Sequence, residues 1–67
     1  MKKDLLKGAI RARGMTQADA ASRIGISLSR FNAKINETGG AELSLGEAKR
    51  LKELLGMSSA EFDQIFL

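Results

Sequence analysis

The chain lacks the side chains on which most catalytic and metal-binding sites depend. It contains neither His nor Cys, which excludes Ser-His-Asp triads, Cys-His pairs, thiolate metal sites and disulfide bonds. No two carboxylates share one face of a predicted helix, so acid–base catalysis by a carboxylate pair has no basis. We therefore expect a binding protein and no enzyme, with no cofactor, no metal and no small-molecule substrate.

The polar side chains with the most specific chemistry lie between residues 27 and 36, in the segment SLSRFNAKIN. Asn32 can hydrogen-bond to N6 and N7 of adenine, and Arg30 can reach O6 and N7 of guanine or a phosphate. Ser29 can donate or accept a hydrogen bond, and the methyl group of Ala33 can contact that of thymine. This combination favours an element that reads base edges in the major groove.

The charge of the chain is distributed unevenly. Residues 1–36 carry eight Lys and Arg against two Asp, a net charge of +6, whereas residues 37–67 carry three against six acidic residues, a net charge of −3. A basic half favours contact with a polyanion. A solvated basic face without a partner is the alternative interpretation.

Five short helices are expected to position these side chains. Glycine predicts helix ends, at Gly14, Gly25 and Gly56. Ser or Thr predicts helix starts by N-capping, at Thr16, Ser27, Ser44 and Ser58, the last two in capping boxes with Glu47 and Glu61. The predicted helices span about 3–13, 17–24, 27–36 and 45–55, with a fifth after residue 58. The chain, residues 1–67, is accordingly predicted to be one compact all-α domain.

Apolar residues at helical spacing are expected to form the core. They are Leu5, Leu6, Ala9 and Ile10, then Ala18, Ala21 and Ile24, then Leu28, Phe31 and Ile35, then Leu45, Ala48, Leu51, Leu54 and Leu55, and last Phe62, Ile65, Phe66 and Leu67. The last group is interpreted as core, with part of it serving a dimer contact as the alternative.

Residues 16–36 have the layout of a helix-turn-helix. Two short helices flank a turn that contains Gly25. Ala21 is small enough for the second helix to cross closely, and Gly25 sits where the chain reverses and needs a positive φ.

This segment resembles the helix-turn-helix of phage Cro and λ-type repressors. The resemblance is carried by Thr16-Gln17, Ala21, Gly25-Ile26-Ser27 and Phe31. A small phage-associated branch is a closer match, because its second motif helix typically reads Ile-Ser-x-Ser-x-Phe-x-x-Lys-Ile-Asn, as residues 26–36 do here. The sequence departs from the broader family at Lys34, where that family usually has an apolar residue, so Ile35 takes over the buried stripe. The resemblance implies a five-helix λ-repressor-like fold with a recognition helix at about 27–36.

The site residues expected from the side-chain chemistry and from the resemblance fall into two groups. The expected base contacts are Leu28, Ser29, Arg30, Asn32 and Ala33. Leu28 is included because the equivalent position often contacts bases in the resembling family, and burial in the stripe with Phe31 and Ile35 is the alternative. The expected phosphate contacts are Gln17, Ser27, Lys34, Asn36, Arg11 and Arg13, with Lys7 as a further basic residue.

The expected function is that of a sequence-specific transcriptional regulator of the phage Cro or repressor type that binds double-stranded DNA. One motif reads only about four or five base pairs, so we expect a homodimer on a palindromic operator whose half-sites lie about 34 Å apart. The alternative is a protein-interaction module of the same fold, an antitoxin or anti-repressor, whose basic face meets an acidic protein.

The sequence gives no indication of membrane association. No apolar run approaches the roughly 18 residues of a membrane span, and Lys7 and Arg11 interrupt any signal-like stretch near the start. We expect the chain to stay in the cytoplasm of a bacterial host cell, at the nucleoid.

Overall fold

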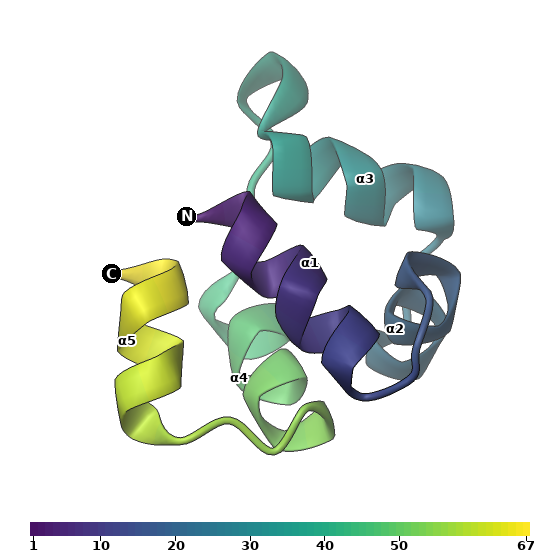
Figure 1. The fold of residues 1–67 in the computed structure, drawn as a ribbon. Coiled ribbons are helices and arrows are strands. Elements are labelled where there is room, and N and C mark those ends of the chain that lie inside the picture. Colours follow the sequence, from purple (N-terminus) through teal and green to yellow (C-terminus); the bar gives the residue numbers. More distant parts are fainter.

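Five α-helices and one short 3₁₀ turn make up the computed structural model, which describes residues 1–67 (Figure 1). They are α1 (Lys3–Ala12), α2 (Gln17–Ile24), α3 (Leu28–Asn36), η1 (Thr38–Gly40), α4 (Leu45–Leu54) and α5 (Ser59–Phe66). No β-strand is present, which confirms the all-α class. The four helices with predicted bounds agree with them to within one residue.

Local capping interactions explain where the helices begin. At α2, Thr16 Oγ1 accepts a hydrogen bond from the Asp19 amide at 3.1 Å, and the Asp19 carboxylate accepts one from the Thr16 amide at 3.0 Å. The hydrogen bond from the Thr16 amide is the main reason that the pKa of Asp19 lies below its ordinary value. The capping boxes predicted at Ser44 and Ser58 are confirmed at α4 and α5.

Helices α2 and α3 each end at a residue in the left-handed backbone conformation. Gly25 follows α2 with a φ of 85°, as the sequence predicts, and glycine adopts this conformation without a Cβ clash. Glu37 follows α3 with a φ of 55°, which is uncommon for a residue with a side chain. The chain therefore turns sharply at both ends of α3.

The core lies between all five helices and is centred on Phe31, whose side chain is fully buried. The buried residues that form one cluster are Leu6, Ile10, Ala20, Ala21, Ile24, Phe31, Ile35, Leu51, Leu55, Met57 and Ile65. Since every helix from α1 to α5 places at least one side chain in or against this cluster, the position of each depends on the others.

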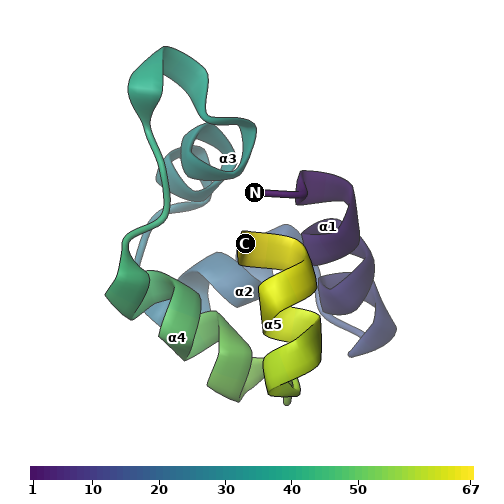
Figure 2. The same cartoon turned by 90° about the vertical axis from the view of Figure 1, so that its left-hand side faces the viewer.

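The two ribbon views agree on the overall arrangement. Figures 1 and 2 show α3 at one end of the molecule and α4 and α5 toward the other, with η1 projecting beyond α3. The two ends of the chain lie near each other, because the Lys2 amide donates to the Ile65 carbonyl at 2.8 Å. No helix is long and apolar enough to cross a membrane.

Several residues that were expected in the core are exposed, so those predictions are wrong. Leu67 is 92% exposed because it follows the last helical residue, and Leu45 and Leu5 are exposed in the first turns of their helices. In α2 the buried side is rotated from the expected one, so that Ala20 is buried and Ala18 is exposed. Phe62 and Phe66 are partly buried and pack on each other, with ring centroids 4.7 Å apart.

Leu28 also departs from the expected buried stripe of Leu28, Phe31 and Ile35. Its side chain is 43% exposed, whereas Phe31 and Ile35 are buried. Leu28 is the first residue of α3 and lies one turn before Phe31. An apolar side chain therefore remains on the open surface at the start of α3.

Candidate nucleic-acid interface

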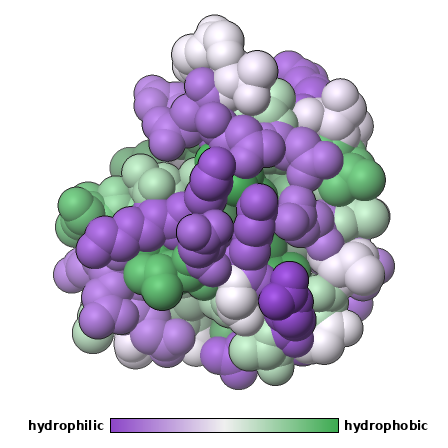
Figure 3. Space-filling model, turned by 45° about the horizontal axis from the view of Figure 1, so that its top comes forward, coloured by the Kyte–Doolittle hydropathy of each residue, from purple (hydrophilic) through white to green (hydrophobic).

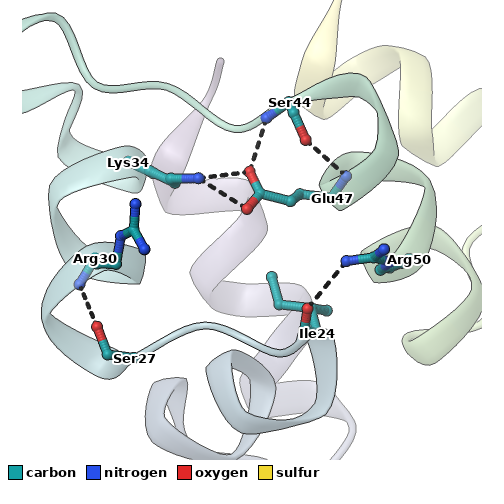
Figure 4. Close-up of polar contacts among 7 residues, drawn as sticks. All are labelled: Ile24, Ser27, Arg30, Lys34, Ser44, Glu47 and Arg50. Carbon is teal, nitrogen blue, oxygen red and sulfur yellow. Dashed lines mark hydrogen bonds and ion pairs between the residues drawn. The ribbon is translucent and has the colours of Figure 1, made fainter.

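The segment that joins α2 to α3 is held by hydrogen bonds at both of its ends. The Ile26 amide donates to the Ala21 carbonyl at 3.0 Å, which closes the end of α2. Arg50 of α4 donates to the Ile24 carbonyl at 3.3 Å (Figure 4). Ser27 Oγ accepts from the Arg30 amide at 3.2 Å, which fixes the first turn of α3. The turn is therefore anchored to α2, α3 and α4.

One side of α3 is buried and the other is open to solvent. Phe31 and Ile35 attach the helix to the core. On the remaining sides Ser29, Arg30 and Asn36 are exposed, and Asn32 and Ala33 are partly buried. We call residues Leu28, Ser29, Arg30, Asn32 and Ala33 the outer face of α3. These are the five predicted base-contact residues, of which Leu28, Ser29 and Arg30 are exposed and Asn32 and Ala33 are partly buried.

The start of α2 forms a second element of the candidate interface. Gln17 lies in a shallow hollow of about 330 Å³ that is also lined by Lys7, Arg11, Met15 and Thr16. The amides of Gln17 and Ala18 have no acceptor within the protein, because they lie in the first turn of α2, where no earlier helical carbonyl is available. Free amides and two cations together favour an anion at this place.

The predicted phosphate contacts do not all lie together. Arg11 lines the hollow at Gln17, but Arg13 points to the far end of α4, where its guanidinium donates to the Gly56 carbonyl at 3.4 Å. Ser27 is exposed beside the outer face, with its Oγ engaged as the cap of α3. Asn36 is exposed at the other end of α3, next to Glu37.

Lys34 makes an internal ion pair. Its ammonium group lies 2.8 Å from both carboxylate oxygens of Glu47, and both side chains are largely buried (Figure 4). The hydrogen bond from Lys34 is the main reason that the pKa of Glu47 lies below its ordinary value, followed by the one from the Ser44 amide. Sequence reasoning did not find this partner. The sequence held one hint of it, because Lys34 stands at a position that is usually apolar in the family that the motif resembles.

The surface of this part of the molecule is mostly hydrophilic. Figure 3, which looks obliquely onto the end of the molecule that carries α3, shows hydrophilic side chains across the centre, with hydrophobic patches between them. Acidic residues are also present here, since Glu37 and Glu42 line a hollow together with Lys34. The unpaired basic residues of this part of the molecule therefore lie on α1, in the last turn of α2 (Arg23) and in the first turn of α3 (Arg30), not at the end of α3.

Comparisons with known proteins found no relative of this chain. No protein-family model, no curated protein and no solved structure matches the chain.

Proposed function

We propose that this protein is a sequence-specific regulator that binds double-stranded DNA, in which α2 and α3 act as a helix-turn-helix. In this proposal α3 enters the major groove and α2 lies across the phosphate backbone. The observation that carries it is the outer face of α3, where Ser29 and Arg30 are exposed and Asn32 and Ala33 are partly exposed, while Phe31 and Ile35 attach the helix to the core.

The outer face offers several ways to read base edges. Asn32 has the donor and acceptor pair that recognises adenine, and Arg30 suits guanine or a nearby phosphate. Ser29 is adaptable, and Leu28 and Ala33 are apolar groups that suit thymine methyl groups. Because Glu37 and Glu42 lie beyond the end of α3, we assign base contacts to its first two turns.

The phosphate contacts in this proposal centre on the hollow at the start of α2. Gln17 and the cations Lys7 and Arg11 line this hollow, and the amides of Gln17 and Ala18 have no acceptor within the protein. Each phosphate that a cation neutralises releases counterions, so affinity falls with salt by a slope of about 0.9 per contact. Arg13 is left out because it is directed toward Gly56.

The protein is proposed to act as a homodimer on a palindromic operator. One helix such as α3 covers too few base pairs to be selective, and two related copies double the length that is read. Half-sites one helical turn apart, about 34 Å, place both copies of α3 on the same side of the duplex.

Selection from a random duplex library, followed by titration of the enriched sequence, tests the proposal. We expect a palindromic consensus, bound at least about 1,000-fold more tightly than a scrambled duplex, with affinity that falls steeply as salt increases. Failure to enrich any sequence, or affinity that does not change with salt, would refute the proposal. If the protein instead co-purifies with an acidic protein after nuclease treatment, the interaction-module alternative is favoured.

A further inference from the structure

The hydrogen bonds between Lys34 and Glu47 are the only side-chain hydrogen bonds that join α3 to another helix. Lys34 Nζ donates to both oxygens of the Glu47 carboxylate at 2.8 Å. The two side chains are 21% and 10% exposed, and Glu47 is the one charged residue that is buried. Two short charge-assisted bonds in a largely desolvated setting define the distance and direction between the two helices.

Glu47 is itself fixed to the start of α4. Its Oε1 accepts a hydrogen bond from the Ser44 amide at 2.9 Å, and its own amide donates to Ser44 Oγ at 3.1 Å (Figure 4). The carboxylate therefore cannot follow Lys34 if α3 moves, unless the cap of α4 opens as well. The chain of contacts runs from α3 through Lys34 and Glu47 to the first turn of α4.

The surroundings of Lys34 oppose a contact with DNA phosphate. To reach a phosphate, Lys34 would have to leave Glu47 as a buried carboxylate without its cation, which is strongly unfavourable. Glu37 and Glu42 also line the hollow next to Lys34, and their negative charge repels a phosphate group. Lys7 and Arg11 of α1, which line the hollow at the start of α2, have no carboxylate partner within ion-pair distance.

We infer that Lys34 and Glu47 are positioning residues that set the pose of α3 and thereby the base preference of its outer face, and that Lys34 does not bind phosphate. This inference rests on the proposed function, because the preference it concerns is for duplex DNA. It replaces the phosphate role expected for Lys34 from the sequence. It also assigns a role in recognition to Glu47, a residue of α4 that contacts no base.

The substitution Lys34→Met keeps the aliphatic stem and removes the charge, and salt titration separates the two roles. If Lys34 is a positioning residue, its replacement should leave the slope of log affinity against log salt unchanged. We expect discrimination between the selected and the scrambled duplex to fall about tenfold. A slope reduced by about one would identify Lys34 as a phosphate contact and overturn the inference. Unchanged discrimination would also overturn it.

Glu47→Gln provides a second test if Lys34→Met does not fold. Glutamine retains an oxygen that can accept from the Ser44 amide, so the start of α4 is kept while the ion pair is lost. We expect discrimination to fall and the salt slope to stay equal or become steeper, because the charge of Lys34 is then no longer balanced. Discrimination equal to that of the wild type would contradict the inference. Lys49→Met, on the exposed side of α4, is the matched control and should change neither quantity.

Hydrogen exchange in the free protein tests the same pair without DNA. Lys34→Met should increase exchange of the amides in the second half of α3 at least several-fold relative to Lys49→Met. Equal exchange in the two variants would show that the pair does not hold α3. If the wild type binds no duplex while exchange rises as expected, the proposed function has failed, the base-preference part of the inference falls with it, and the holding role of the pair stands.

Discussion

At the scale of single residues, neighbouring positions of α3 have opposite surroundings. Phe31 is fully buried, whereas Asn32 is partly open and Ser29 is exposed. Substitutions at the open positions should therefore leave the fold intact and alter only what the surface binds. This separation makes the base and phosphate contacts testable one residue at a time.

Asn32→Ala and Arg11→Ala should weaken DNA binding in different ways. Asn32→Ala removes a base-edge donor and acceptor, so discrimination between the selected and the scrambled duplex should fall about tenfold. Arg11→Ala removes a phosphate contact, so affinity for every duplex should fall alike and the salt slope should decrease by about one. Anisotropy titrations at several salt concentrations measure both. A uniform loss in both variants would show that the outer face is assigned incorrectly.

Leu28 should read a thymine methyl group. Replacing the contacted thymine by uracil removes one methyl group, and its burial is worth about 0.8 kcal/mol, or roughly a fourfold loss of affinity. In Leu28→Ala the same replacement should cause no further loss. A scan of uracil at each thymine of the selected site measures this. Leu28 has no such role if every uracil penalty is the same in wild type and variant.

At the scale of the elements, the backbone conformation at Gly25 makes the turn between α2 and α3 sensitive to substitution. Gly25 and Gly8 both have free space where a Cβ would be added, but only Gly25 has a positive φ, of 85°. Gly25→Ala should therefore lower the free energy of unfolding by about 1 kcal/mol or more. Gly8→Ala, inside α1, should raise it by about 0.5–1 kcal/mol. Urea denaturation measures both, and two changes of the same sign would contradict the explanation.

The link between α3 and α4 should be sensitive to acid. The pKa of Glu47 is lower in the folded protein than its ordinary value of 4.5. The ion pair therefore contributes stability above about pH 4.5, and this contribution is lost as pH falls through the lower folded pKa. Between pH 5 and pH 3 the wild type should lose more unfolding free energy than Glu47→Gln. Equal losses, measured by urea denaturation at several pH values, would show that the pair does not stabilise the fold.

Most helix bounds could be predicted because the signals that determine them are local. Thr16, Ser44 and Ser58 cap helices through residues three positions away, and Gly25 acts within its own turn. The surroundings of Leu28 and Lys34 could not be predicted in the same way. Leu28 is exposed although it lies one turn before the buried Phe31, and Lys34 is paired because α4 brings Glu47 to it. Both depend on how the helices pack, which periodicity along one helix does not describe.

At the scale of the whole molecule, the central claim is that one end of a small helical bundle presents α3 to the major groove. The outer face of α3 follows the Gly25 turn, and the hollow at the start of α2 takes its two cations, Lys7 and Arg11, from α1. Glu37 and η1 lie beyond the end of α3, and the C-terminal end of α5 lies close by, since Phe66 lines the same hollow as Lys34 (Figures 1 and 2). In the proposed complex the duplex therefore contacts the first two turns of α3 and the start of α2, away from these acidic residues.

Titration of isotope-labelled protein with a duplex, followed by amide and side-chain chemical shifts, tests this claim most directly. The account predicts that the largest changes fall on Leu28, Ser29, Asn32 and Ala33 and on the amides of Gln17 and Ala18, with small changes in α5. Changes concentrated in α5 or at the end of α4, with the outer face of α3 unaffected by saturating duplex, would contradict it.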